Sequence, residues 1–521
     1  MSEIKRYYKR LADWLDWKKI SVITAGLSVL SLLPIVYLSF FNYATGDDLG
    51  YGAPLHQVIV RGGDPAEMIT AVTGNIRNFY YSYQGTWSSI ALFSVEPSIW
   101  GERFYLLTTW IALFCLIFCQ GLLIHELLVH HFGLSRPSFL FLFSIMVFLQ
   151  TQYMPYHRSG LFWYTGIAHY VIPYGVCMLG FFWMLRFLAD GRWGYLLGCL
   201  IAMTYLGGAG YPEVVLAAMV FLIVLIATPI VHLHGKKDLR CVWLLLPFLS
   251  LLIGFAISAK APGNRIRGGA EFGFHIDHAA ATIGRALLAG WTDAIHYFIA
   301  VRPMMLFLIL IIVCAWETLP VSDGCFCQKH PILILAGLYL IFSAIHAPEL
   351  YVGEDVMAGI SGGVYNSYFF VFTCCILLGT VTVTGWMKSV YQKKKSIKAQ
   401  MLDTAVGSDR KKRPFAQWVR IPCLLMILLF CLVFRAHLIG GTTDYVAIEY
   451  IRSGQLADFR RQMKDRLEIL ENPSIRDAVL DPINDWQGPF MHFPVGDDPK
   501  SFVNLVTAEF YDKDSVVVRK D

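Results

Sequence analysis

The sequence predicts an all-α polytopic membrane protein with about eleven transmembrane helices. Hydrophobic residues make up 56% of the 521-residue chain and charged residues only 16%, and the mean hydropathy is +0.52. These values lie outside the range of soluble globular proteins. Aromatic residues reach 15% of the chain, which fits two interfacial belts of Trp and Tyr.

The predicted spans are the apolar runs long enough to cross a bilayer as helices. Several of these runs are short or interrupted by Gly or Pro. They lie near residues 20–41, 104–124, 138–152, 168–188, 194–210, 213–231, 241–259, 303–317, 331–346, 365–386 and 419–436.

The N-terminus is basic and precedes an apolar run too long for the core of a cleaved signal peptide. We therefore expect an uncleaved signal anchor with a cytoplasmic N-terminus. On this orientation the basic loops fall on the cytoplasmic side, as the positive-inside rule requires, and an odd number of spans leaves the C-terminus extracytoplasmic. The predicted cytoplasmic loops are His125–Arg136, Arg186–Arg192, His234–Arg240, Glu317–His330 and Lys388–Arg420.

Two features of the cytoplasmic side have alternative interpretations. The basic loop 387–420 is compatible with nucleic-acid binding, but beside a span it favours contact with anionic lipid and a role in topology, so we expect no nucleic-acid partner. All 12 cysteines lie in apolar segments or in these loops, so we expect no disulfides. The pair Cys325 and Cys327 leaves a zinc site open, although a lone C-x-C motif is weak evidence.

The predicted organisation is a transmembrane module, residues 1–436, followed by an extracytoplasmic tail, residues 437–521. The module includes a long first external loop, residues 42–103. It also includes an amphipathic stretch at about 272–301, which we expect to lie in the outer interface as a helix. The tail shows helical periodicity through Ile448–Leu470.

Asp47 and Asp48 follow the first apolar run directly, between Gly46 and Gly50. Acids at or near the membrane are costly, by roughly 2.5–3.5 kcal/mol at the centre of a helix, and usually have a function. The glycines indicate that the helix has ended. The alternative is a solvated loop that happens to be acidic.

Other ionisable and aromatic residues gather in the predicted external segments. A carboxylate can accept a proton from an attacking hydroxyl, and a guanidinium can bind a phosphate leaving group. Together with aromatic rings, these groups suit glycosyl transfer from a lipid phosphate at the membrane surface. The alternatives are a helix-ending turn at 261–267, an N-terminal helix turn at Glu213 and interfacial-belt roles for the aromatic residues.

The motif Asp47-Asp48-Leu-Gly-Tyr51 after a first span resembles the glycosyltransferase C (GT-C) superfamily, whose members place a catalytic acid in the first external loop. It is similar to the Asp-Asp-Gly-Tyr of mycobacterial arabinosyltransferases. Further motifs resemble, in their order, a group of bacterial polytopic proteins of unknown function that are related to O-antigen-modifying glucosyltransferases. These motifs, which extend the resemblance over nearly the whole chain, are Phe162–Tyr170, Gly207–Glu213, Ala261–Arg267 and Asn504-x5-Phe510-Tyr511.

The resemblance implies an inverting glycosyltransferase in a bacterial inner membrane, with residues 1–436 as the catalytic module. A sugar would move from a polyprenyl-phosphate donor to an envelope glycan or lipid acceptor on the extracytoplasmic face. Asp47 would be the general base and Asp48 its neighbour or a second ligand. The leaving group carries its own charge, so no metal is required, and a divalent cation near the two acids stays open. The implied substrate-binding residues are Arg265, Arg267, Asn264, Glu213, His157, Arg158, Trp163, Tyr164 and Tyr51.

The chain departs from the group's pattern at two places. The turn that ends in Tyr211-Pro-Glu213 lacks the Asn that usually precedes the Glu, and the late external segment 346–366 is acidic and contains no Arg. The phosphate-binding candidates are therefore Arg158, Arg265 and Arg267. Two other classes stay open: a transporter or lipid flippase, and a non-catalytic scaffold for envelope assembly.

Overall fold

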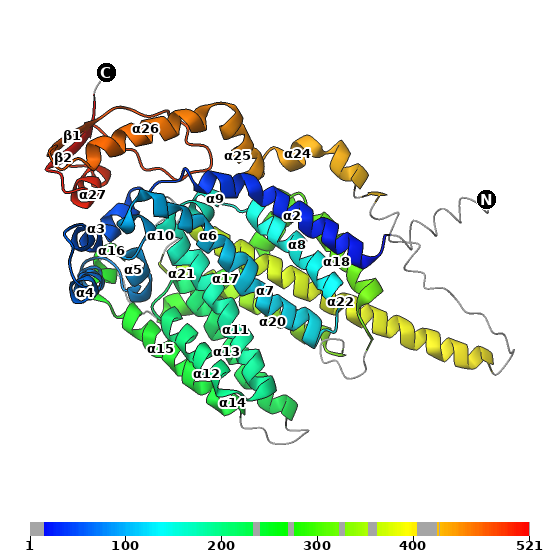
Figure 1. Cartoon of the computed structure of the whole chain (residues 1–521). Helices are drawn as coiled ribbons and strands as arrows, with labels where there is room; N and C mark the ends of the chain where they lie inside the picture. Colours follow the sequence, from blue (N-terminus) through cyan, green and yellow to red (C-terminus); the bar gives the residue numbers. More distant parts are fainter. Residues whose placement is uncertain are drawn as a thin grey trace.

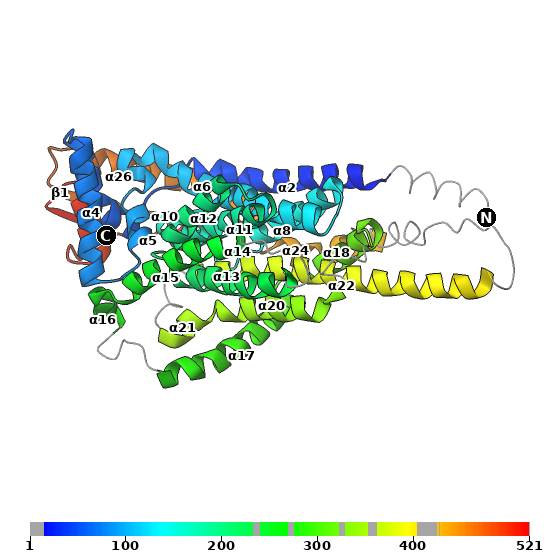
Figure 2. The same cartoon turned by 90° about the horizontal axis from the view of Figure 1, so that it is seen from below.

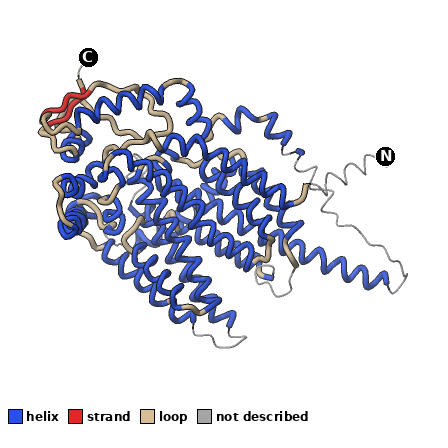
Figure 3. The backbone as a smooth tube through the Cα atoms, viewed as in Figure 1, coloured by secondary structure: helices blue, strands red, loops and turns tan. Residues whose placement is uncertain are grey.

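The computed structural model describes residues 15–232, 240–268, 276–321, 329–352, 362–403, 425–426 and 428–519. Nearly all of its regular structure is helical (Figures 1 and 3). Among the described residues, the strands are β1 (Asp477–Leu480) and β2 (Ser515–Val518), which pair in parallel near the C-terminus. The predicted all-α class is therefore confirmed for this part of the chain, apart from this one short sheet.

Long apolar helices form the main bundle (Figure 1). The first ten predicted apolar runs each fall on a bundle helix, and the eleventh, 419–436, lies partly outside the described residues. The run near 104–124 lies in a longer helical stretch, Glu102–His131, which includes two π-helical turns, η3 and η4. The bundle elements are α2 (Trp17–Ser39), α6 (Leu107–Phe114), η3 (Cys115–Cys119), α7 (Gln120–His125), η4 (Glu126–His131), α8 (Arg136–Gln152), α11 (Ile172–Asp190), α12 (Trp193–Leu206), α13 (Tyr211–His232), α14 (Arg240–Trp243), α15 (Leu245–Ala259), α18 (Met304–Thr318), α20 (Pro331–Ala344) and α22 (Gly363–Asp403).

The helices support a membrane-embedded protein, with a smaller span count than the sequence suggests. Among the described residues, six helices are long and apolar enough to cross a membrane, or seven if a bent pair counts as one span. The bent pair joins α17 (Ile276–Ala300) to α18 at an angle of 94°. The predicted runs at 194–210 and 331–346 form shorter helices of 14 residues each. The count of eleven therefore stays a prediction.

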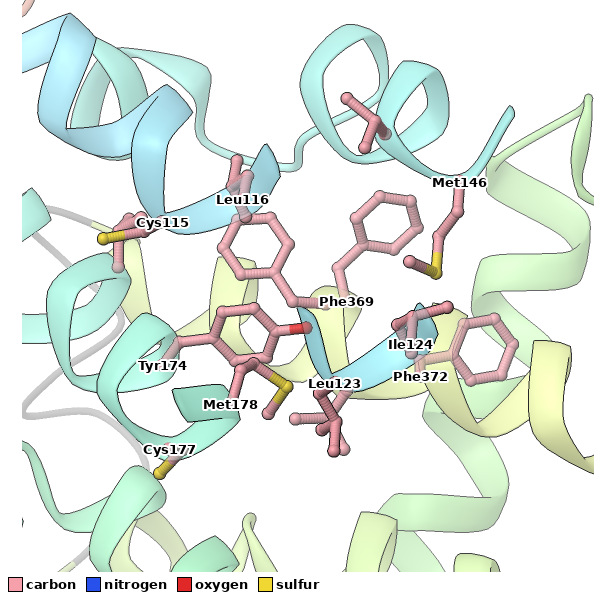
Figure 4. Packing of buried hydrophobic residues seen from close by; sticks show 14 of the residues in the cluster. Cys115, Leu116, Leu123, Ile124, Met146, Tyr174, Cys177, Met178, Phe369 and Phe372 are labelled. Carbon is pink, nitrogen blue, oxygen red and sulfur yellow. The ribbon is translucent and has the colours of Figure 1, made fainter. Parts of the chain in front are cut away.

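The bundle core packs Met, Phe and Leu side chains from helices far apart in the sequence (Figure 4). Within it, Gln120 and Gln150 exchange side-chain hydrogen bonds of 2.8 and 3.0 Å. Gln150 also donates to Thr373 at 2.8 Å, and the Tyr174 hydroxyl donates to Gln120. These buried polar groups satisfy one another, so the network joins α7, α8, α11 and α22.

One end of the bundle carries the start of α2. There the Trp17 indole donates to Glu317 at 2.8 Å, and the Lys388 ammonium donates to the Leu319 carbonyl at 2.6 Å. In Figures 1 and 2 the Lys-rich part of α22 extends beyond the bundle at this same end. The start of α2, the end of α18 and the Lys-rich part of α22, which the charge pattern assigns to the cytoplasm, therefore lie at the same end of the bundle.

The opposite end, called here the α3 end, gathers the predicted external segments. Side-chain hydrogen bonds connect Asn42 to Phe162, Gly85 to Asn264, Ser88 to Tyr205 and Tyr156 to Asn366. No membrane is present in the structure, so the side of the membrane that each end faces stays a prediction.

The predicted first external loop, 42–103, is mostly helical. Figure 2 shows its second helix, α4, lying crosswise to α2 and α22 at the α3 end. Asp64 caps α4 by accepting the Glu67 N–H at 2.9 Å, and Pro65 follows at the first helical position. The elements here are α3 (Asp47–Val60), α4 (Pro65–Ser82), α5 (Trp87–Phe93), η1 (Pro97–Trp100) and η2 (Glu102–Leu106).

The predicted tail folds into a compact C-terminal unit that packs on the α3 end (Figure 1). The Phe510 ring stacks on His56 at 4.0 Å, and the Gln57 side chain donates to the Phe510 carbonyl at 2.8 Å. Helical periodicity at 448–470 corresponds to parts of two helices. After the short α24 (Arg435–Ile439), the unit contains α25 (Thr443–Arg452), α26 (Gln455–Leu470) and α27 (Phe502–Phe510), together with β1 and β2.

The predicted interfacial stretch, 272–301, contains α17, and residues 269–275 lie outside the described residues. The C-terminal end of α17 packs against the bundle, where the centroid of the Tyr297 ring lies 5.1 Å from that of the Phe372 ring. An interfacial position for α17 stays a prediction. Cys325, Cys327 and residues 404–420 of the basic loop also lie outside the described residues.

Candidate functional site

Asp47 and Asp48 open α3, and their carboxylates have different surroundings. Gly46 precedes them with a φ of +54°, which L side chains rarely adopt, and a Cβ there would lie 2.6 Å from the Phe493 ring. Asp48 is fully buried, whereas Asp47 is half-buried. The two acids therefore do not form one paired site.

Asp48 is part of a closed hydrogen-bond network. Its Oδ1 accepts the Thr165 N–H at 2.8 Å and the Thr165 hydroxyl at 2.6 Å, and its Oδ2 accepts the Tyr105 hydroxyl. The Tyr105 oxygen in turn accepts the Tyr164 N–H at 3.1 Å. Burial raises the pKa of Asp48 to about 6 despite these bonds. Asp48 therefore joins α3 to the bundle and is not presented to a substrate.

Asp47 is the open carboxylate of the pair. Within the described residues it forms no hydrogen bond or ion pair. Burial raises the pKa of Asp47, and the charge of Arg267 partly offsets that rise. Tyr51, one turn further along α3, lies within electrostatic range of both Asp47 and Arg267. A half-buried carboxylate with a raised pKa and no partner suits a general base.

Arg267 connects several elements of the α3 end. Its guanidinium donates to Gln84 and lies 4.9 Å from the centre of the Tyr83 ring, both in the turn between α4 and α5. Arg267 belongs to α16 (Pro262–Gly268). Its charge also acts on four titratable side chains from separate elements: Asp47, His169, Tyr211 and Glu349. We call these four residues, Arg267, Gln84 and Tyr83 the Arg267 cluster.

Asn264 and Arg265, which precede Arg267, differ in their burial and in their contacts. Buried Asn264 accepts the Gly85 N–H at 2.8 Å and donates to the Ser258 carbonyl at 2.8 Å. It therefore fixes α16 against the α4–α5 turn instead of facing a substrate. Arg265 is exposed and, among the described residues, contacts no member of the cluster. The structure thus distinguishes two arginines that the sequence treats as equivalent.

Glu213 lies in the first turn of α13 and is 1% exposed. Its Oε1 accepts the Ser367 hydroxyl, and its Oε2 has no partner among the described residues. Glu349, in α21 (Ala347–Val352), acts electrostatically on both Glu213 and Arg267. Burial raises the pKa of Glu349 to about 7. Glu213 therefore lies next to the cluster.

The remaining predicted site residues, which are Trp163, Tyr164, His157 and Arg158, have separate surroundings. Trp163 is buried against Phe493 of the C-terminal unit, with its indole N–H unpartnered within the described chain. Tyr164 is buried beside the Asp48 network. His157 begins α9 (His157–Leu161), where burial lowers its pKa to about 4, and Arg158 is exposed. No described contact brings His157 or Arg158 to Asp47 or Arg267.

The structure adds residues that the sequence did not single out as site residues. Gln84 lies in the first external loop, and Glu349 lies in the acidic segment 346–366. His169 and Tyr211 lie in the motifs Phe162–Tyr170 and Gly207–Glu213. A weak signal existed for His169, because it lies in the π-helical turn η5 (Ile167–Val171) just before Pro173. Such turns frequently occur at functional sites.

In the part of the chain that the structure describes, the acids do not gather into a multidentate metal site. Within the described residues, no three His, Cys, Asp or Glu side chains gather closely enough to hold an ion. Asp48 directs both carboxylate oxygens into its own hydrogen-bond network, and a divalent cation near the two acids stays a prediction. When the chain is compared with known protein families and with curated proteins, none of them matches it.

Proposed function

We propose that the chain is a membrane glycosyltransferase of the GT-C type, acting at the α3 end on the extracytoplasmic face of a bacterial inner membrane. The observation that carries the proposal is the pair Asp47 and Arg267. An open, half-buried carboxylate lies within electrostatic range of a guanidinium positioned by Gln84 and Tyr83. A base beside a phosphate-binding group is the minimum that transfer from a lipid phosphate requires.

In the proposed reaction, an acceptor hydroxyl loses its proton to Asp47 and its oxygen bonds to the anomeric carbon of the sugar. The bond from that carbon to the phosphate oxygen breaks, and polyprenyl phosphate leaves with the bonding electrons. Arg267 stabilises the charge that develops on the phosphate. Attack opposite the leaving group inverts the anomeric carbon. The acceptor is an envelope glycan or lipid.

A mainly apolar pocket of 470 Å³ offers a place for the start of the lipid chain. Trp87, one of its lining residues, is three residues after the Gln84 that bonds Arg267. A phosphate at Arg267 would therefore have its hydrocarbon chain directed between α5 and α12. The pocket is lined by Trp87, Ser88, Ala91 and Leu92 of α5 and Leu200, Ile201, Thr204 and Tyr205 of α12.

The polar network in the bundle core favours transfer over transport. A transporter places ionisable or polar groups at mid-span, where a substrate can reach them. Gln120, Gln150, Thr373 and Tyr174 instead pair with one another. The open ionisable groups discussed above lie at one end of the bundle, which is where a surface transferase needs them.

The first test is mass spectrometry of the lipids that co-purify with wild type, Arg267→Ala and Arg265→Ala. We expect a polyprenyl-phosphate sugar with wild type and with the Arg265 control, and its loss with Arg267→Ala, because only Arg267 lies in the cluster. Bulk phospholipid alone in all three samples would argue for a transporter or a scaffold.

The second test replaces the base. Asp47→Asn keeps the size of the side chain but cannot accept the proton, so we expect glycan transfer to fall by about 10²–10⁴-fold. The protein should still retain the donor lipid, since Arg267 is intact. Transfer at the wild-type rate by Asp47→Asn would contradict the assignment of Asp47.

A further inference from the structure

Two buried polar atoms, one in the Arg267 cluster and one beside it, have no hydrogen-bond partner among the described residues. They are Glu213 Oε2 and His169 Nδ1. An unsatisfied buried polar atom costs about 1–3 kcal/mol, so native structures rarely keep one without a reason. A bound group that supplies the missing hydrogen bonds is such a reason.

Gly210 holds these two residues close to each other. A Cβ on Gly210 would lie 2.6 Å from the His169 carbonyl oxygen and 2.8 Å from Glu213 Oε2. Any side chain at this position would therefore clash with both residues, so only glycine lets the turn pass this close to them. The backbone of the turn that precedes α13 passes directly against η5 as a result.

Both side chains are also held in place. Ser367 of α22 donates to Glu213 Oε1, which leaves Oε2 as the free oxygen. The His169 ring packs against Phe93 at 5.7 Å and against Tyr170 at 4.7 Å. The unpartnered atoms therefore belong to oriented side chains, which is the condition for selective recognition.

The charges around these atoms restrict what they can bind. Arg267 acts on His169, and Glu349 acts on Glu213. A cationic group would meet Arg267 and an anionic group would meet Glu213 and Glu349, so neither charge is favoured. A neutral hydroxyl can donate to Glu213 Oε2 and can pair with His169 Nδ1 in either tautomer of the imidazole.

We propose that Glu213 and His169, separated by Gly210, form a hydroxyl-binding subsite that takes ring hydroxyls of the transferred sugar. The inference rests on the proposed function, because a phosphate at Arg267 places the sugar beside this subsite. It assigns donor selectivity to Glu213 and His169, and it leaves the chemical step to Asp47. A site built to bond a hydroxyl rejects ligands that lack it, because its own buried groups stay unpaired.

The test compares the binding of two kinds of lipid by the full chain in nanodiscs. One probe is bare polyprenyl phosphate, and the others are polyprenyl phosphates that carry glucose, galactose, mannose or arabinose. Wild type should bind at least one sugar-bearing lipid more tightly than the bare lipid. Glu213→Gln should lower the affinity for that sugar-bearing lipid by about 10- to 100-fold. It should change the affinity for the bare lipid by less than about threefold.

His169 is tested with two substitutions. His169→Phe should lose the preference for the sugar, whereas His169→Asn should recover part of it, because the amide places a polar atom near the position of Nδ1. Ser343→Ala is the matched control, since Ser343 Oγ is likewise buried and unpartnered among the described residues but lies in α20 against Gly290. It should leave both affinities unchanged.

The outcomes separate the subsite from the proposed function. A wild-type chain that binds bare and sugar-bearing lipids equally overturns the subsite alone. A wild-type chain that binds neither lipid overturns the proposed function and the subsite together. Equal loss of both lipids in Glu213→Gln shows that Glu213 acts through packing, which also overturns the subsite.

Discussion

Thr165 and Asp48 are 117 residues apart, and two hydrogen bonds join them through one carboxylate oxygen. The Thr165 N–H and hydroxyl reach Asp48 Oδ1 at 2.8 and 2.6 Å. This contact binds the first turn of α3 to the segment that follows Trp163. It also explains why the two acids differ. The carboxylate of Asp48 is hydrogen-bonded to Thr165, whereas the carboxylate of Asp47 has no hydrogen bond within the described residues.

Asp48 should be required for stability. Asp48→Ala leaves the Thr165 N–H, the Thr165 hydroxyl and the Tyr105 hydroxyl without an acceptor, so we expect a loss of about 3 kcal/mol. Thermal unfolding in detergent measures it. Asp48→Asn is the control, because its carbonyl oxygen still accepts from Thr165 and the loss should be smaller. Equal unfolding temperatures for wild type and Asp48→Ala would contradict this role.

The stability that Asp48 contributes should fall as pH rises. Its pKa is about 6 in the folded chain and 3.8 as the reference value, so the folded state holds the proton more tightly. The part of this contribution that comes from binding the proton is full below about pH 4 and is lost by about pH 6, a change of roughly 3 kcal/mol. The hydrogen bonds from Thr165 and Tyr105 act at either pH. The unfolding temperature of wild type should therefore drop across this range relative to Asp48→Asn. Parallel curves for the two proteins would exclude the effect.

Gly46→Ala should be more destabilising than Gly62→Ala. Both glycines have a positive φ, +54° and +75°, so both substitutions strain the backbone by at least about 1–2 kcal/mol. The strain is larger at Gly46, where ψ is −114° and the backbone lies outside the left-handed helical region. Only at Gly46 would the new Cβ also meet Phe493, at 2.6 Å, whereas nothing lies within 4 Å at Gly62. The difference between their unfolding free energies measures this contact of α3 with the C-terminal unit together with the larger backbone strain at Gly46.

The double variant Gly46→Ala/Phe493→Ala provides the check on that interpretation. Removal of the Phe493 ring should relieve the clash but not the backbone strain. On the Phe493→Ala background, the loss of unfolding free energy caused by Gly46→Ala should therefore approach that caused by Gly62→Ala. No recovery would mean that the cost at Gly46 arises from the backbone alone.

Asn264 should stabilise the fold by joining α16 to the α4–α5 turn. Asn264→Ala leaves the Gly85 N–H unpaired in a buried turn, and we expect a loss of about 2–3 kcal/mol. The exposed Asn78 in α4 is the control, and Asn78→Ala should change stability by less than about 0.5 kcal/mol. If Asn264→Ala weakens lipid retention without any change in unfolding, Asn264 is a ligand-binding residue instead.

The helices of the bundle could be predicted because their cause is local. An apolar run of about 20 residues forms a helix when its backbone must satisfy its own hydrogen bonds. The ten predicted runs outside 419–436 coincide with helices for that reason. The number of spans could not be settled in this way, because α17 and α18, which meet at 94°, fit either one broken span or a re-entrant loop.

Part of the candidate site could also be predicted. The motif Asp47-Asp48 and the run that ends in Arg267 contain the two residues on which the proposed function depends. The sequence does not tell Asp47 from Asp48 or Arg265 from Arg267, since each pair has the same chemistry. It also offers no reason to join His169 to Glu213 across a glycine.

The sequence by itself therefore determined the helical class, the apolar segments and the motifs that carry acids and arginines. The tertiary structure alone decided which members of those motifs are open. Asp48 is closed by Thr165 and Tyr105, and Arg267 is positioned by Gln84, through contacts between residues 57 to 183 positions apart. Side-chain surroundings of this kind come from packing between distant segments, which local composition and periodicity do not encode.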